Sequence, residues 1–471
     1  MAGKHEIDFT SGPLLKKIII YALPIIGVNI LQLLFTAADV AVLGIFTNDQ
    51  AVAAVGATSQ IVNLLVGFFV GLSVGANVLV ARAAGAKDKS RASRLVGTSV
   101  VVSVLFGVVI MVVGILLSEQ FLIWTNCAES VLPYAKKYLQ IYFLGMPIIM
   151  LYNFSAAILR VVGDTLRPLI FLASSGVANI LLNIFFIVVC GLDVEGVAIA
   201  TVASQLISAV GALVIMVKNT GYARLEKRYL KIDKKSFADI FAIGLPMGLS
   251  KCTFSFANVI IMSSLNALGD LVMAANSIAK EFDSFILETL HGISLASLAV
   301  ISQNLGAKKI DRIKRTVYLS LGLATVIGII MGAALLVSGR ALCGIMTDTE
   351  EVINYCMVRI IFVGVPYGVC GLVNVMQEAV RGLGHSNLSL GISIIANIVF
   401  RLFWIWAVYP ALYVEGSIRN NFAFICMVWP ASWVISLVLA TVAYFYLIKR
   451  LENKFKNENI QNERETANVT G

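Results

Sequence analysis

The chain has 471 residues, of which 59% are hydrophobic and only 13% are charged. Soluble domains carry about 25% charged residues, so this composition excludes a soluble globular protein and indicates a protein embedded in a membrane. The formal net charge of +9 comes largely from loop lysines and arginines, and we interpret it as a signal of membrane topology, not of nucleic-acid binding.

Twelve apolar segments, six in each half of the chain, are long enough to cross a bilayer, which takes roughly 20 residues. We expect helices, because a backbone in lipid must satisfy its own hydrogen bonds and the segments do not alternate as barrel strands do. Six helices per half would give both halves the same orientation, so the repeat would be parallel. The predicted spans are 17–44, 52–81, 95–117, 134–159, 168–190, 196–217, 240–265, 272–303, 316–338, 353–379, 388–410 and 422–447.

The two halves carry the same local motifs at a nearly constant offset. Pro24 lies in the first span, and Pro246 follows it 222 residues later. A Gly-Ala-Lys loop ends the second span at 85–87 and the eighth span at 306–308. The stretch 159–163 has a similar counterpart 221 residues later. Two similar halves in a membrane protein leave a natural cleft between them, and this architecture suggests alternating access around a central site.

Basic residues gather in alternate loops and at both ends of the chain. They fill the N-terminal segment, the loops after the second and eighth spans, the connector after the sixth span and the C-terminal segment. Because basic loops stay cytoplasmic, both termini are predicted to be cytoplasmic in a multi-pass protein of the plasma membrane, the cytoplasmic membrane if the source is bacterial. The first apolar segment is too long for a signal-peptide core, so we expect it to be retained.

These features divide the chain into four expected regions. Residues 1–218 form an N-terminal six-helix bundle, 219–235 a basic cytoplasmic connector and 236–450 a C-terminal six-helix bundle. The polar segment 451–471 is rich in Asn, Glu and Lys, and it is predicted to be a disordered cytoplasmic tail.

No pattern in the sequence points to an enzyme or to a bound cofactor. The seven cysteines form no CxxC pair and no Cys/His spacing that suits a structural metal. The chain has no phosphate-binding loop with a Lys-Ser/Thr ending, so it carries no ATPase of its own. It also shows no nucleophile–base pair. We therefore expect no catalytic residues, no structural metal and no cofactor.

Polar residues inside the first-half spans predict an ion site. Asp39 lies in the first span, where an isolated carboxylate costs at least a few kcal/mol. It must be protonated, bound to a cation or paired across helices. Asn179 and Asn183 lie on one face of the fifth span, four residues apart, and Thr201 and Gln205 do the same on the sixth. Their oxygens can complete a cation's shell beside Asp39 if all of them converge, although each alone is better explained by a helix–helix hydrogen bond.

The eighth span is the most polar one, and we expect it to line a cavity in the second half. Its acids can be compensated by Lys251 in the seventh span and Arg401 in the eleventh. The network is either structural or a proton-responsive substrate surface, with Glu281 and Asp283 as the leading candidates. The charged side chains of the eighth span are Lys280, Glu281, Asp283, Glu288 and His291.

In order and spacing, these motifs together resemble the multidrug and toxic compound extrusion (MATE) family over essentially the whole chain. The stretch 159–168, Leu-Arg-Val-Val-Gly-Asp-Thr-Leu-Arg-Pro, is similar to the family's LRGxGDTRxP. The resemblance implies a V-shaped pair of six-helix bundles and export of organic cations or other amphipathic molecules in exchange for Na⁺ or H⁺. Asp39, Asn179 and Thr201 match the family's first-half ion or proton site, and Pro24 is the expected helix bend.

Two departures limit what the resemblance implies. The family often has an Asp where this chain has Asn183, and the acid that some members carry in the seventh span is missing around Lys251. The coupling ion is therefore left open between Na⁺ and H⁺, and coupling is left open between the two halves. Related flippases of lipid-linked saccharides are the alternative, but they have a strongly cationic cavity. The expected partners are the bilayer and small, cationic, amphipathic substrates, with no nucleic acid and a monomeric state.

Overall fold

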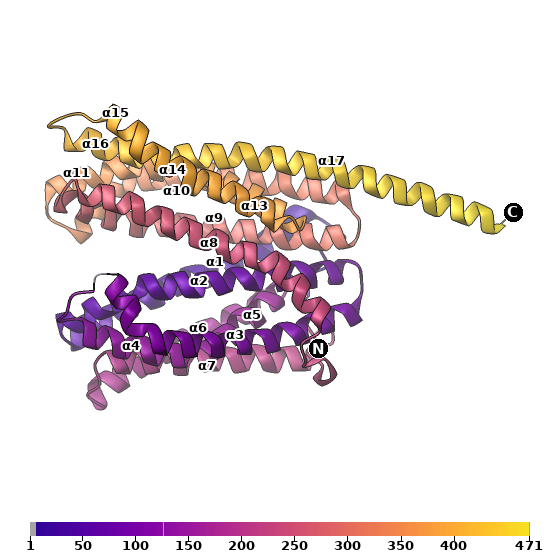
Figure 1. Ribbon diagram of the computed structural model, residues 1–471, viewed down its shortest axis with the longest axis horizontal. Helices are drawn as coiled ribbons and strands as arrows, with labels where there is room; N and C mark the ends of the chain where they lie inside the picture. The colour runs from indigo at the N-terminus through magenta and orange to yellow at the C-terminus, as the bar shows by residue number, and fades with distance from the viewer. Residues whose placement is uncertain (1–5, 126, 471) are drawn as a thin grey trace. The chain divides into compact units, whose positions relative to one another are not determined.

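Every regular element of the described residues is helical (Figure 1). The computed structural model describes residues 6–125 and 127–470, apart from the side chains of Asp49 and residues 459–470. The elements are α1 (Leu14–Phe46), α2 (Asp49–Gly85), α3 (Lys89–Trp124), α4 (Leu132–Leu144), α5 (Met146–Val161), α6 (Leu166–Ile184), η2 (Phe185–Val189), α7 (Val194–Lys218), η3 (Lys227–Tyr229), α8 (Lys234–Asn266), α9 (Asp270–Gly306), α10 (Ile310–Met346), α11 (Glu350–Arg359), η4 (Ile360–Gly364), α12 (Tyr367–Gly382), α13 (Ser386–Ser393), η5 (Ile394–Val399), α14 (Phe400–Phe403), η6 (Trp404–Val408), α15 (Tyr409–Leu412), α16 (Ile418–Cys426) and α17 (Val428–Thr470).

Eleven of the described helices, some joined across short breaks, are long and apolar enough to span a bilayer. The pair α4 and α5 gives a twelfth candidate, bent by 53° at its break. The bend falls where Pro147 occupies the first turn of α5, because proline removes a backbone donor and clashes with the preceding turn. The prediction of an all-α polytopic membrane protein with up to twelve spans is confirmed.

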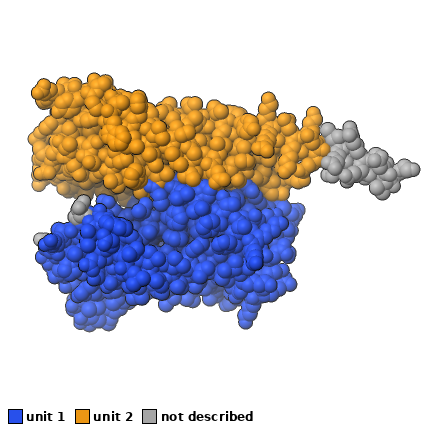
Figure 2. Space-filling model, in the orientation of Figure 1, with its two compact units in different colours: residues 1–8, 20–252 blue, residues 9–19, 253–471 orange. Residues whose placement is uncertain are grey.

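The chain forms two compact units (Figure 2). Unit 1 contains residues 1–8 and 20–252, and unit 2 contains residues 9–19 and 253–471. The boundary falls inside the long helix α8, between Cys252 and Thr253. The connector belongs to unit 1, where Glu226 accepts a hydrogen bond from Ser93 Oγ over 3.1 Å and Lys231 O accepts one from Thr98 Oγ1 over 3.3 Å.

The internal repeat is visible in the backbone of the Gly-Ala-Lys loops. Lys87 and Lys308 are the two non-glycine residues of the described chain with positive φ, at 59° and 56°. In each loop the next amide donates to the carbonyl five residues earlier, over 2.9 Å. This is a Schellman cap, which normally uses glycine at the left-handed position. Two lysines in the same strained conformation show that both halves end their second helix in the same way.

A second pair of caps follows the same rule. Gly163 and Gly384, 221 residues apart, have φ of 102° and 85°. The amide after each glycine again donates to the carbonyl five residues earlier, over 3.0 and 3.2 Å. At Gly163 the fit is tight, because a Cβ there would lie 2.2 Å from the Ile7 nitrogen. The N-terminal segment therefore packs directly on this loop of unit 1.

The tail differs from the sequence-based expectation. Residues 451–471 are predicted to be disordered, whereas α17 continues as a helix to Thr470. Lys and Glu are good helix formers, and ion pairs hold the start of this extension to α10 and the loop before it. Glu452 pairs with Lys314, and Glu458 pairs with Lys308 over 2.6 Å. The composition of the tail does not predict these contacts with other parts of the chain.

Candidate ion-coupling site and buried charge network

The first-half candidates converge inside unit 1. Asn183 Nδ2 donates to Asp39 Oδ1 over 2.6 Å and to Asn179 Oδ1 over 3.3 Å. Asn179 Nδ2 donates to Thr201 Oγ1 over 3.4 Å, and the Thr201 hydroxyl donates to Val197 O over 2.9 Å. The four predicted residues, from α1, α6 and α7, thus form one hydrogen-bonded chain that ends on the carboxylate.

This chain leaves oxygen atoms that a cation can use. Asn183 Oδ1, on the residue that bonds Asp39, is buried and accepts no hydrogen bond from the described residues. The same is true of Gln205 Oε1, four residues after Thr201 on α7. None of the ion pairs among those residues involves Asp39. A carboxylate at this depth without a cationic partner is costly unless it binds a proton or a metal ion. One carboxylate plus neutral oxygens is a donor set that suits a hard cation such as Na⁺.

Two tyrosines on α4 extend the site. Tyr138 and Tyr142 stack with ring centroids 6.1 Å apart, and both interact electrostatically with Asp39. Sequence reasoning missed them, because two aromatic residues four apart on a helix are ordinary packing residues. Their place beside Asp39 depends on how α4 packs in the fold, which the sequence does not show. Pro24 lies fifteen residues earlier, inside the uninterrupted helix α1.

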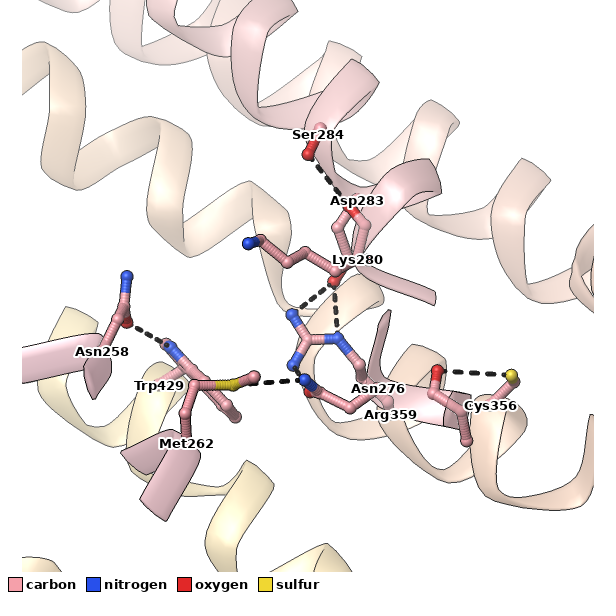
Figure 3. Close-up of polar contacts among 10 residues, drawn as sticks. Asn258, Met262, Asn276, Lys280, Asp283, Ser284, Cys356, Arg359 and Trp429 are labelled. Atoms are coloured by element: carbon pink, nitrogen blue, oxygen red, sulfur yellow. Dashed lines mark hydrogen bonds and ion pairs between the residues drawn. The ribbon is translucent and has the colours of Figure 1, made fainter. Parts of the chain in front are cut away.

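In unit 2, Asp283 is buried and paired with a residue that sequence reasoning did not single out (Figure 3). Arg359 Nε and Nη2 bond Asp283 Oδ2 over 3.0 and 2.9 Å. The third guanidinium nitrogen of Arg359 donates to Asn276 Oδ1 over 2.8 Å, and Arg359 Cζ lies 4.8 Å from the Trp429 ring centroid. The eighth-span acids were expected to be compensated by Lys251 and Arg401, but for Asp283 the partner is Arg359.

Arg401 is buried, with 1% of its surface exposed, and its described hydrogen bonds go to neutral groups. Its Nε donates to Ser432 Oγ and its Nη1 to Asn258 Oδ1, both over 3.2 Å. Asn258 Oδ1 also accepts from Trp429 Nε1 over 3.4 Å, so Arg401 and Arg359 belong to one network. With Asp283 as its one acid, this network carries a net charge of +1.

The eighth-span acids do not form a single site. Asp283 is buried, whereas Glu281 and Lys251 are exposed in the structure. Glu288 lies 3.7 Å from His291 in a separate, half-buried pair. Helical geometry explains the split, because residues two apart point to opposite sides. Glu288 and His291, three residues apart, lie on one face of α9, as helical spacing predicts.

Widened helical turns border the key side chains. The π-helical segment η2 begins two residues after Asn183, η4 begins directly after Arg359, and Arg401 lies between η5 and η6. A π turn inserts an extra residue and re-aims the neighbouring side chains, and such turns often occur at functional sites. Among the described residues, no group of three or more His, Cys, Asp or Glu could hold a metal ion.

Both halves of the chain match the model of a known family. A model of the MatE family aligns with residues 24–185 and 246–406, one stretch in each half. The chain belongs to the MatE family. This MatE protein is therefore a multi-span helical membrane protein of a transporter family, and the resemblance seen in its motifs is confirmed.

Relatives of this MatE protein carry related names. The probable multidrug resistance protein YoeA of Bacillus subtilis is 25% identical over 445 residues, which cover 92% of this chain and 94% of that protein. The probable multidrug resistance protein YpnP of Bacillus subtilis is 29% identical over 299 residues, with coverage of 64% and 67%. The multidrug export protein MepA of Staphylococcus aureus is 23% identical over 357 residues, with coverage of 75% and 78%.

Solved MATE structures share the fold. A multidrug resistance MATE family transporter of the MOP superfamily, in an outward-facing conformation, gives a TM-score of 0.83 at 21% identity, covering 95% of this chain and 98% of that one. The Vibrio cholerae transporter VcmN in its bent form also gives 0.83, at 22% identity, covering 93% and 97%.

Proposed function

We propose that this protein is a secondary active antiporter that exports amphipathic organic cations, such as drugs and other xenobiotics, in exchange for Na⁺ or H⁺. The names of its relatives support export of several drugs. The observation that carries the coupling is Asp39, a membrane-embedded carboxylate bonded to Asn183 and without a described cationic partner.

The proposed mechanism needs one group that changes charge with ion occupancy. Empty, the Asp39 carboxylate is negative and is held by Asn183 over 2.6 Å. A captured Na⁺ or proton neutralises it and competes for that hydrogen bond, so Asn183 would keep only its bond to Asn179 Oδ1, at 3.3 Å. Two alternative hydrogen-bond arrangements give unit 1 two states whose populations the ion shifts.

In unit 2 we assign the substrate-responsive role to the Asp283–Arg359 pair. A buried pair persists only while both charges keep their partners. A cationic substrate that approaches Asp283 would compete with Arg359, whose remaining contacts to Asn276 and Trp429 can still hold it. Glu281→Gln and Asp283→Asn should both weaken transport of cations, and the loss should be larger for the buried Asp283.

We also propose that the protein is a monomer in the plasma membrane with both termini cytoplasmic. The basis is the clustering of Lys and Arg in alternate loops. Reporter tags at residues 1, 227 and 471 should all give a cytoplasmic signal. An external signal at 227 would contradict the twelve-span arrangement.

Flipping of lipid-linked saccharides is the alternative function. Recognition of lipid phosphates calls for a strongly cationic surface, whereas the described polar centres of this protein carry charges of both signs. Unit 1 presents the acid Asp39, and the unit 2 network carries a net charge of +1. This mixed polarity supports cation export over flipping.

Transport by purified protein in vesicles tests the proposal. Vesicles loaded with an ethidium-like fluorescent cation would receive a Na⁺ gradient and, separately, a pH gradient of equal size. One of the two gradients should drive movement of the dye, and an ionophore that collapses that gradient should stop it. Dye movement that ignores both gradients would contradict antiport, and flipping of a labelled lipid phosphate would favour the alternative.

A further inference from the structure

Two buried cysteines lie on the neighbouring helices α10 and α11 of unit 2. Cys343 and Cys356 are both free and both have 0% of their surface exposed. Cys356 Sγ donates to Ala275 O over 3.4 Å.

The packing of the two helices places these residues opposite each other. α10 ends at Met346 and α11 begins at Glu350, so a short connection makes them antiparallel neighbours. A Cβ added at Gly339 would lie 2.7 Å from Ile360 Cδ1. Moving four residues along α10 and four residues back along α11 from that contact leads to Cys343 and Cys356.

We propose that Cys343 and Cys356 are a modification site, an oxidisable dithiol that closes to an intramolecular disulfide. The co-reactant is a small-molecule disulfide. The thiolate of one cysteine attacks it, forms a mixed disulfide and releases one thiol. The second cysteine then attacks the mixed disulfide and releases the second thiol. The protein loses two protons and two electrons, and the small disulfide gains both.

A disulfide between Cys343 and Cys356 would restrain the helix that carries Arg359. It would tie α10 to α11 one helical turn before Arg359, which holds Asp283. If the termini are cytoplasmic, the loop 347–349 faces the outside of the cell, where disulfides persist. The chemistry itself does not depend on that orientation or on transport.

Peptide mapping of the wild-type protein tests the proposal. The full chain in detergent would react with 4,4′-dithiodipyridine, a small apolar disulfide, until thiol release stops. Mass spectrometry should find the peptides of Cys343 and Cys356 linked to each other. Two separate pyridyl adducts at these positions, linkage to other cysteines, or two thiols left free after the exposed cysteines have reacted would each overturn the proposal.

Single serine variants trap the intermediate. In Cys343→Ser, Cys356 should keep its pyridyl adduct, because the resolving thiol is gone, and in Cys356→Ser the adduct should stay on Cys343. Cys127→Ser, which changes an outer-loop cysteine of unit 1, should leave the cross-link unchanged. Oxidation should raise the apparent Tm of the wild type by about 5 °C in a way that reductant reverses, and it should not raise that of Cys343→Ser. An equal rise in both proteins would contradict the assignment.

Discussion

The buried Asp283–Arg359 pair makes a sharp prediction about stability. Asp283→Asn removes the charge but keeps one oxygen that accepts from the Arg359 guanidinium. Removing one partner of a buried pair costs about 3–5 kcal/mol. Arg359 keeps its bond to Asn276 at 2.8 Å and its contact with Trp429 at 4.8 Å, so we place the loss near the lower end, about 3 kcal/mol.

Thermal unfolding of the purified protein measures this loss. For a unit of this size, about 3 kcal/mol corresponds to a fall of roughly 6–12 °C in apparent Tm. Glu281→Gln is the matched control, because Glu281 lies two residues away on the same helix but is exposed. The control should change stability by less than about 0.5 kcal/mol.

A double variant separates the charge from the packing. Asp283→Leu with Arg359→Met removes both charges and leaves apolar side chains, so it should recover most of the stability that either single change loses. The reasoning would be refuted if Asp283→Asn melts like the wild type. A double variant that loses the sum of the two single losses would refute it too.

Three further changes test the local structure and the ion site. Gly163→Ala should lower stability more than Gly191→Ala. Both glycines have positive φ, which costs about 1–2 kcal/mol for a residue with a side chain, but only at Gly163 would the added Cβ also clash, with Ile7. Equal losses of Tm in the two variants would contradict this. Burial raises the pKa of the Glu6 carboxyl above its usual 4.5. The protonated form therefore favours the fold, and its contribution is complete below pH 4.5 and lost as the pH rises through the raised folded-state pKa. Glu6→Gln should flatten this part of the stability–pH curve, and an unchanged curve would argue against it. Asn183→Asp should raise the apparent affinity for the coupling cation or shift the pH dependence of transport, and identical ion titrations in both proteins would count against the first-half site.

The sequence predicted the architecture well because lipid leaves few choices. Apolar segments of sufficient length must be helical, and paired motifs such as Gly85 and Gly306 expose the repeat. Breaks inside spans were harder to predict. Pro147 signals the bend between α4 and α5, but the π segments near Asn183, Arg359 and Arg401 have no sequence signature that we recognised. The helical tail beyond Asn453 depends on ion pairs to another helix, which composition does not reveal.

The convergence of the first-half polar residues was predictable and the second-half network was not, for one physical reason. The predicted spans of the first half hold no acid besides Asp39, so polar residues at helical spacing pointed to it. In unit 2 several charges lie close in sequence, and their pairing depends on the rotation of each helix. Arg359 follows two glutamates near the start of α11 and reads as an interfacial residue, yet it is the partner of Asp283.

Gradient-driven efflux by Asp39→Asn, measured beside substrate binding, tests the central claim most directly. The variant keeps the size of the side chain and an acceptor for Asn183, but it cannot change charge when an ion arrives. We predict that reconstituted Asp39→Asn no longer moves a fluorescent cation against its gradient. Its affinity for that cation in detergent should stay within about tenfold of the wild type, roughly 1.4 kcal/mol. Efflux against a substrate gradient by Asp39→Asn would contradict the account and move the coupling to the charges of unit 2.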